Sequence, residues 1–314
     1  MTTSSAPLIL VTCRQMQVEL PRHRDRIEKL GYEVVAPDLG ARQQFTAAEL
    51  LERGDSRLVG IIAGDDELDR EFFEGADKLK VLIRWGIGMD SVDHDAAREH
   101  AVTVRNTPGV FGYEVADSAF GYILNLARGH ILIDAAVRQG EWPKWEGVTL
   151  SGARLGIVGF GSIGHEIAFR GRGFGMDVVA FDPFVDTPPD GVTMLGLDEL
   201  MSTSRFIVLA CPLTPDTARM INSDRLALTR PDAYLVNVAR GPVVVEADLI
   251  DALKAGRLAG AALDVFEVEP LPEDSELRTL PNVVLGAHNA SNTREGVARA
   301  SETAVDFLIE ELTR

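Results

Sequence analysis

Three polar side chains that could carry acid–base chemistry follow apolar, strand-like segments in the C-terminal half of the chain. Arg240 comes after residues 234–239, Glu269 lies in 262–270, and His288 comes after 283–287. In an open parallel sheet the carboxyl ends of the strands line one crevice, so these side chains could converge there. Taken singly, each also has a plain structural interpretation, as a surface histidine, a turn arginine and a solvated carboxylate.

Together the three residue types suit the reduction of a carbonyl group. Such a reaction needs a proton donor that titrates near neutrality, a cation that holds and polarises the substrate, and a carboxylate that keeps an imidazole protonated. His288, Arg240 and Glu269 fit these tasks in that order. In the reverse direction, neutral His288 would take the hydroxyl proton.

A glycine motif lies earlier in the chain, between an apolar strand-like segment and a helical one. Gly159, Gly161 and Gly164 form a GxGxxG pattern directly after residues 154–158. The first glycine permits a tight turn, the second lets the backbone approach a pyrophosphate, and the third lets helix and strand pack closely. The helix N-terminus favours the negative charge, so the segment predicts a dinucleotide site.

The next apolar segment ends in Asp182, which is followed by Pro183. An acidic side chain at this place accepts hydrogen bonds from ribose hydroxyls and repels a 2′-phosphate. The sequence therefore favours NAD over NADP. The alternative is that Asp182 is only a turn carboxylate.

Short apolar segments alternate with segments of helical period along the chain, which indicates parallel sheets with crossover helices. At 314 residues two domains are expected. A helical stretch from Tyr113 past Ala127 and a loop over Gly140–Gly152 resemble a spacer between them, and a last helix over Thr293–Leu312 could return to the first domain. The expected strands of the first domain are 8–13, 33–36, 58–63, 81–85 and 102–105, and those of the second are 154–158, 178–181, 206–209, 234–237, 260–264 and 283–285.

The composition excludes several classes of partner. With 31 basic and 48 acidic residues the net charge is −17, which disfavours nucleic acid and anionic membranes. No stretch approaches the roughly 18 apolar residues that span a bilayer, and the N-terminus lacks a leader, so we expect a cytoplasmic protein. Cys13 and Cys211 are expected to be buried thiols, and no metal-ligand spacing is visible.

Nearly the whole chain resembles the D-isomer-specific 2-hydroxyacid dehydrogenase family, which includes phosphoglycerate dehydrogenases and hydroxypyruvate or glyoxylate reductases. The resemblance rests on ordered motifs: RWGIGMD (84–90), NTPG (106–109), EVAD (114–117), GIVGFGSIG (156–164), FDP (181–183), PLTP (212–215), NVARG (237–241), ALDVFEVEP (262–270) and His288.

The resemblance implies two Rossmann-like α/β domains with parallel sheets. It implies an NAD-binding domain over 107–288, inserted in a discontinuous substrate domain over 1–106 and 289–314, with a cleft between them and homodimers common. It also implies that Asp264 binds the nicotinamide carboxamide. The implied catalytic residues are Arg240, Glu269 and His288; the implied cofactor-binding residues are Gly159, Gly161, Ser162, Ile163, Gly164, Asp182, Pro183, Cys211, Pro212, Thr217, Val238, Ala239, Arg240, Asp264 and His288; and the implied substrate-binding residues are Arg84, Gly86, Ile87, Gly88, Arg240 and His288.

The implied role of Gly86–Gly88 is to hold the substrate carboxylate, which suits a glycine turn that aims successive N–H groups at an anion. Two departures bear on the substrate: Asn289 follows the histidine where Ile is frequent, and Ser91 follows Asp90 where Asn is usual. They point to a subgroup and remove no catalytic group.

Residues 63–66 read Ala-Gly-Asp-Asp, where a phosphate-binding member would offer a cation. Repulsion by Asp65 and Asp66, of order 1 kcal/mol each, favours a small unphosphorylated 2-hydroxy or 2-oxo acid. D-3-phosphoglycerate remains an alternative, with Arg84 or a helix N-terminus supplying the charge. An alternative of another class is an NAD(H)-sensing protein similar to the corepressors related to this family.

Overall fold

The computed structural model describes residues 6–40, 42 and 44–314, and the chain divides into two compact units. Unit 1 runs to Phe111 and resumes over Asn292–Arg314, while unit 2 comprises Gly112–Ser291. The sequence places the boundaries at 106/107 and 288/289, so the observed changes of unit come five and three residues later. The two-domain α/β fold class with parallel sheets is confirmed.

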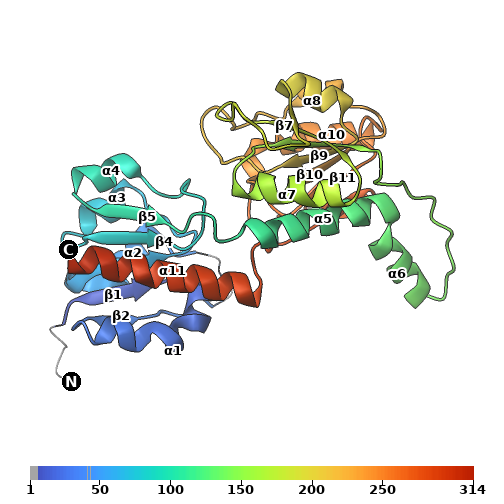
Figure 1. The fold of residues 1–314 in the computed structure, drawn as a ribbon. Helices are drawn as coiled ribbons and strands as arrows, with labels where there is room; N and C mark the ends of the chain where they lie inside the picture. The colour runs from blue at the N-terminus through green and yellow to red at the C-terminus, as the bar shows by residue number, and fades with distance from the viewer. Residues whose placement is uncertain (1–5, 41, 43) are drawn as a thin grey trace. The chain divides into compact units, whose positions relative to one another are not determined.

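Unit 1 is built on a parallel sheet with the order β2-β1-β3-β4-β5 (Figure 1). Strands β1 and β3 have the sequences LILV and LVGIIA and are buried throughout, as expected for strands covered on both faces. The strands are β1 (Leu8–Val11), β2 (Glu33–Val35), β3 (Leu58–Ala63), β4 (Val81–Arg84) and β5 (Thr103–Asn106). The helices are α1 (Arg14–Glu28), α2 (Ala47–Gly54), α3 (Arg70–Gly75), α4 (His94–Glu99) and α11 (Arg294–Thr313).

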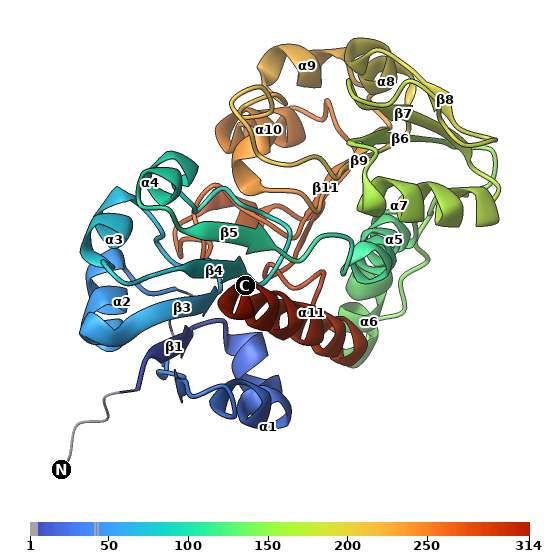
Figure 2. The same cartoon turned by 60° about the vertical axis from the view of Figure 1, so that its left-hand side comes forward.

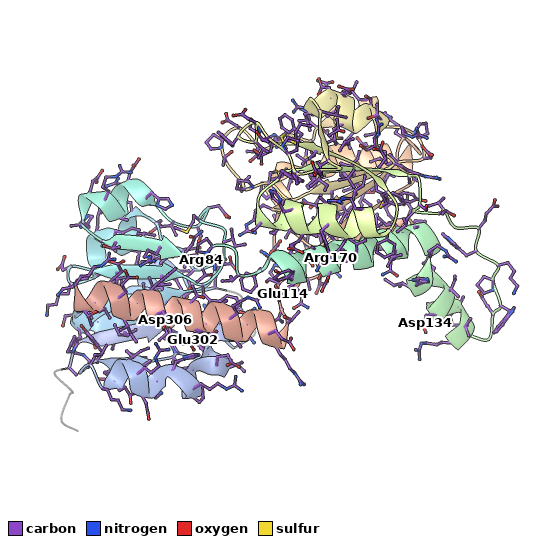
Figure 3. All side chains as sticks on the ribbon, in the orientation of Figure 1. Arg84, Glu114, Asp134, Arg170, Glu302 and Asp306 are labelled. Carbon is purple, nitrogen blue, oxygen red and sulfur yellow. The ribbon has the colours of Figure 1, made fainter. Side chains whose placement is uncertain are left out.

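The C-terminal helix α11 returns to unit 1, as the sequence predicts, and lies along its sheet (Figure 2). The hydroxyl of Thr293 caps it by accepting the N–H of Gly296 at 3.0 Å. Across the contact with α1, Arg26 pairs with Glu302 and Asp306, each at 2.6 Å (Figure 3). The end of the chain therefore helps to cover the same core as its beginning.

Unit 2 is built on a parallel sheet with the order β12-β11-β10-β9-β6-β7-β8. Counted from β6, its strands follow the doubly wound 3-2-1-4-5-6 order of dinucleotide-binding folds, with β12 added at the edge. The strands are β6 (Arg154–Val158), β7 (Asp177–Phe181), β8 (Thr193–Met194), β9 (Phe206–Leu209), β10 (Tyr234–Asn237), β11 (Gly260–Leu263) and β12 (Val283–Leu285). The helices are α5 (Gly112–Arg128), α6 (His130–Arg138), α7 (Ser162–Gly173), α8 (Leu197–Thr203), α9 (Ser223–Leu228) and α10 (Glu246–Lys254).

The helical stretch that resembled a spacer is α5, which is part of unit 2, in agreement with the expected domain range 107–288. Its residues Val115, Ala119 and Ile123 are buried, at the helical spacing of one apolar face. Arg170 of α7 pairs with Asp117 of α5 at 2.7 Å and with Glu166 at 2.6 Å (Figure 3). An apolar face and an ion pair together explain why this segment packs on the second core.

Helix α6 and the short strand β8 were not predicted as separate elements. The loop after α6 contains no helix or strand up to β6, as expected for 140–152. In the described residues no helix is both long and apolar enough to cross a membrane.

Candidate active site

The glycine motif forms the turn between β6 and α7. Gly159 has φ of +93°, and a Cβ there would lie 2.5 Å from the backbone nitrogen of Cys211. A Cβ on Gly164 would lie 2.3 Å from the carbonyl oxygen of Gly159, so both residues must be glycine for the protein itself to pack. A Cβ on Gly161, by contrast, would meet no heavy atom within 4 Å. The space in front of Gly161, at the N-terminus of α7, fits the pyrophosphate of a dinucleotide.

The carboxylate of Asp182 lies at the end of β7, next to this turn. One oxygen accepts the N–H of Phe160 at 2.8 Å, and the other accepts the N–H of Phe184 at 2.9 Å. Asp182 therefore does support a turn, and it also joins the strand end to the glycine loop. Each carboxylate oxygen can accept a second hydrogen bond, so these contacts leave room for ribose hydroxyls.

Other residues expected to bind cofactor follow β9 and β10. Cys211 is 8% exposed, and burial raises the pKa of its thiol to about 11, so the thiol is neutral at physiological pH. The hydroxyl of Thr217 donates to the carbonyl of Pro212 at 2.6 Å and folds that loop on itself. Val238 and Ala239 are both 7% exposed. Pro183 is exposed after Asp182.

Arg240 lies on a turn that is fixed from two sides. The buried amide of Asn237 accepts the N–H of Ala239 and donates to the carbonyl of Arg240, both at 3.0 Å. Gly241 packs closely against the segment that follows β11, because a Cβ on Gly241 would lie 1.8 Å from the carbonyl oxygen of Phe266. The sequence did not single out Asn237 or Gly241 for this positioning role, although both lie within the quoted NVARG motif.

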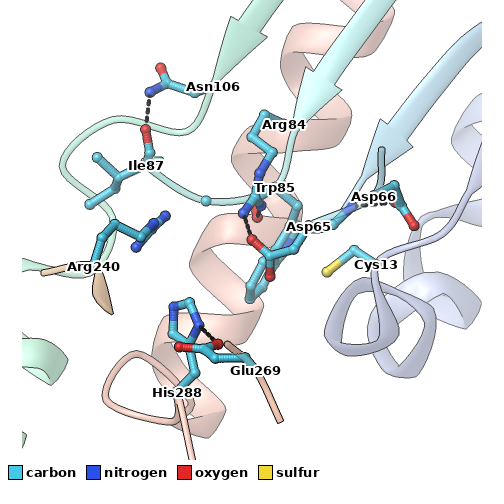
Figure 4. A network of polar contacts seen from close by, with 12 residues as sticks. Cys13, Asp65, Asp66, Arg84, Trp85, Ile87, Asn106, Arg240, Glu269 and His288 are labelled. Atoms are coloured by element: carbon cyan, nitrogen blue, oxygen red, sulfur yellow. Dashed lines mark hydrogen bonds and ion pairs between the residues drawn. The ribbon is translucent and has the colours of Figure 1, made fainter. Parts of the chain in front are cut away.

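Glu269 and His288 form a direct pair (Figure 4). Oε2 of Glu269 is 2.8 Å from Nδ1 of His288, and Oε1 accepts the N–H of Phe266 at 2.9 Å. The two side chains are 31% and 34% exposed, so the pair is open to solvent on one side. Because Glu269 takes Nδ1, the other ring nitrogen of His288 is the one placed to exchange a proton with a substrate.

These three side chains come from neighbouring strands of one sheet. Arg240 follows β10, Glu269 follows β11 and His288 follows β12, and the order β12-β11-β10 makes the three strand ends adjacent. The close approach of Gly241 to Phe266 brings the Arg240 turn against the segment that also donates to Glu269. Unit 2 thus brings together the residues that the sequence analysis grouped by chemistry.

Asp264 is enclosed by groups of the protein. It is 1% exposed, and its carboxylate accepts the hydroxyl of Tyr122 at 2.7 Å and the N–H groups of Asn289 at 3.2 Å and Ala290 at 2.9 Å. Its carbonyl accepts the N–H of His288 at 2.7 Å. Carboxamide binding by Asp264 stays a prediction, while the contacts give it a role in holding the histidine turn.

The expected carboxylate-binding turn lies in unit 1, after β4. Gly86 has φ of +138°, and the side chain of Thr107 accepts its N–H at 2.9 Å. The amide of Asn106 donates to the carbonyl of Ile87 at 2.8 Å. Ile87 and Gly88 are partly exposed residues, and among the described residues we find no acceptor for their N–H groups. Such N–H groups suit an anion.

The electrostatic picture drawn from Asp65 and Asp66 needs correction. Asp66 is 1% exposed and accepts the hydroxyl of Thr12 and the N–H groups of Phe45 and Gly64, so it is a structural carboxylate. Burial raises the pKa of its carboxyl group above the usual value, and the three hydrogen bonds act against that shift. Asp65 pairs with Arg84, whose guanidinium also donates to the carbonyl of Trp85 (Figure 4). Arg84 is 5% exposed, and direct contact of this residue with a substrate stays a prediction.

Comparison with known proteins identifies the family. Residues 120–290 match the model of the D-isomer specific 2-hydroxyacid dehydrogenase, NAD binding domain, which is more than half of the chain. The chain belongs to the D-isomer-specific 2-hydroxyacid dehydrogenase family. Its recognition from sequence, its class as an NAD-dependent oxidoreductase and NAD as the cofactor of its family are thereby confirmed.

Relatives of this 2-hydroxyacid dehydrogenase differ in length and in named substrate. A glyoxylate reductase of Pyrococcus furiosus is 41% identical, over 85% of this chain and 83% of the relative. A D-3-phosphoglycerate dehydrogenase of Methanocaldococcus jannaschii is 36% identical over 94% of this chain, which spans only 56% of that relative's length. The crystal structure of the TT0316 protein from Thermus thermophilus is 37% identical, with a TM-score of 0.86 over 98% of this chain and 97% of that one.

Proposed function

We propose that this 2-hydroxyacid dehydrogenase interconverts a small, unphosphorylated D-2-hydroxy acid and its 2-oxo acid, of the size of glyoxylate or hydroxypyruvate. The observation that carries the proposal is the pair of Glu269 and His288, 2.8 Å apart, at adjacent strand ends of the sheet that also bears the glycine turn. A relative matched over most of both chains is a glyoxylate reductase, which supports the small substrate.

The residues divide the chemistry between them. Gly161 and the N-terminus of α7 would hold the pyrophosphate of the dinucleotide, and Asp182 would accept hydrogen bonds from its ribose hydroxyls. Reduced nicotinamide, when bound, supplies the hydride. His288 would give its proton to the carbonyl oxygen of the substrate, and Glu269 would stabilise the imidazolium form that precedes this proton transfer. Arg240 holds the carboxylate and polarises the carbonyl.

The contacts of Arg84 favour an unphosphorylated substrate. Its charge is neutralised by Asp65 and its side chain is buried, so it is poorly placed to meet a phosphate dianion. Arg84 instead packs against the Gly86–Gly88 turn, because a Cβ on Gly86 would lie 2.8 Å from its guanidinium. The N–H groups of this turn suit a carboxylate.

Initial rates of NADH oxidation with a panel of 2-oxo acids test the proposal. We expect kcat/KM with glyoxylate or hydroxypyruvate to exceed that with phosphohydroxypyruvate by about tenfold or more, because no unpaired cation is offered to the phosphate by Arg84. NADPH should be a poorer donor than NADH because Asp182 repels the 2′-phosphate. A preference for phosphohydroxypyruvate would establish the phosphoglycerate alternative. Tight NADH binding without turnover of any acid would establish the sensor alternative.

We also propose that the protein is a homodimer and works in the cytoplasm. Helix α6 has no buried residue, and large apolar side chains on it and the following loop are exposed: Ile131 (53%), Leu132 (41%), Val137 (41%), Trp142 (75%) and Trp145 (48%). Several large apolar side chains exposed on one helix and its following loop are typical of a protein interface, and a second copy is the partner that is always present. Both cysteines are buried free thiols, which suits a reducing compartment.

A further inference from the structure

The turn that carries His288 is held by helix α5 through one buried carboxylate. Tyr122 of α5 donates its hydroxyl to Oδ1 of Asp264 at 2.7 Å. The same carboxylate accepts the N–H groups of Asn289 and Ala290, and the carbonyl of Asp264 accepts the N–H of His288. A tyrosine remote from the catalytic residues in sequence is thus two hydrogen bonds from the backbone that carries the imidazole.

The turn needs this support because its conformation is unfavourable by itself. His288 has φ of +49°, in the left-handed region that costs a residue with a Cβ about 1 kcal/mol or more. A change of this backbone angle would move the imidazole relative to Glu269, with which it pairs at 2.8 Å. The hydrogen bonds to Asp264 hold it in place.

The surrounding residues make room for the contact between Tyr122 and Asp264. A Cβ on Gly286 would lie 2.2 Å from the hydroxyl of Tyr122 and 2.4 Å from Oδ1 of Asp264, so only glycine fits there. One helical turn before Tyr122, the hydroxyl of Ser118 donates to the carbonyl of Ala290 at 3.1 Å. Burial and the charge of Asp264 raise the pKa of Tyr122, so its hydroxyl stays a donor at every working pH.

We propose that Tyr122 is a positioning residue for the acid–base step: its hydroxyl fixes the carboxylate of Asp264, which holds the 288–290 turn and so keeps the imidazole of His288 paired with Glu269. The inference rests on the proposed function, because it assigns Tyr122 a role in the reaction of that same site. It predicts that removal of one oxygen atom on α5 slows proton transfer while the nucleotide site at β6 and α7 is unchanged.

The variant Tyr122→Phe tests the kinetic part, with Tyr113→Phe as the matched control. Tyr113 lies on the same helix with its side chain 59% exposed. We expect kcat per NADH-binding site to fall about tenfold in Tyr122→Phe, since a small misplacement of a catalytic group is costly, while the Kd for NADH stays within about twofold. A purely structural role would lower the number of NADH sites and leave turnover per site unchanged. That outcome, or equal turnover in both variants, would overturn the proposal.

Hydrogen exchange of the backbone amides of Asn289 and Ala290 tests the structural part without any substrate. These amides should exchange faster in Tyr122→Phe than in the wild type, and at the wild-type rate in Tyr113→Phe. If these amides exchange at the wild-type rate in Tyr122→Phe, Tyr122 does not stabilise the 288–290 turn, and the proposal is refuted whether or not the enzyme is active. Absence of turnover in the wild-type protein would instead refute the proposed function, so the two failures are distinguishable.

Discussion

At the scale of single residues, the pair of Glu269 and His288 makes a sharp prediction. His288→Gln keeps a polar side chain but cannot deliver a proton, so kcat for 2-oxo-acid reduction should fall by about 10²-fold or more. The Kd for NADH, measured by fluorescence, should stay nearly constant because the glycine turn is untouched. His100→Gln, at an exposed position after α4, serves as the control and should behave as wild type. Equal losses in kcat and NADH binding would mean that His288 is structural.

Asp182 shows how a structural and a functional interpretation of one residue can hold together. Its carboxylate accepts two backbone N–H groups, so it is the turn residue that its neighbour Pro183 suggests. One of those N–H groups belongs to Phe160 inside the glycine motif. The same contacts that make a turn therefore also place an acidic group beside the expected ribose, and the two interpretations need not compete.

At the scale of elements, the glycines of the turn between β6 and α7 differ in role: Gly159 and Gly164 are needed for packing, and we expect Gly161 to be needed for nucleotide binding. Gly164→Ala should lower the free energy of unfolding by about 1–3 kcal/mol, because its methyl group would collide with the carbonyl of Gly159. Gly161→Ala meets no protein atom, so its melting temperature should stay near wild type while NADH binds more weakly.

Thermal unfolding and NADH titration of both variants check this contrast. A Gly161→Ala variant that binds NADH as tightly as wild type would show that nothing approaches the backbone there. A stable Gly164→Ala variant would show that α7 can shift away from β6.

The second feature at the scale of elements is that β10, β11 and β12 are neighbouring strands. Each strand delivers one catalytic candidate to the same edge of the sheet, and Asn237 and Gly241 fix the first of them. Strand neighbours follow from hydrogen bonding between segments distant in sequence. The chain order of the motifs is compatible with adjacency but does not establish it.

At the scale of the whole molecule, the exposed apolar surface of α6 and its loop predicts association of two copies. Wild-type protein should have the mass of a dimer by light scattering. The double variant Ile131→Glu and Leu132→Glu should shift it to monomer, because charges would be buried at the interface. The matched control is Val18→Glu with Leu30→Glu, two exposed apolar residues of unit 1, and it should stay a dimer. A monomeric wild type would contradict the proposal.

The sequence by itself determined much of this molecule. Strands such as 154–158, 206–209 and 234–237 were predicted with their observed bounds, because buried parallel strands are continuous apolar runs between turn residues. The glycine motif and the chemical trio of Arg240, Glu269 and His288 were also recognisable, since reaction chemistry restricts residue type.

Only the tertiary structure decided where side chains of ambiguous type belong. Asp66 looked like a site carboxylate and proved to be buried. The segment 113–127 resembled a spacer and proved to be a helix that packs on the core of unit 2. The sequence analysis made no prediction for Tyr122, whose hydroxyl contacts Asp264. A local pattern records how polar a residue is and how it repeats. It does not record which distant group will satisfy a buried charge, and in the histidine turn that pairing is made by contacts between α5, β11 and β12.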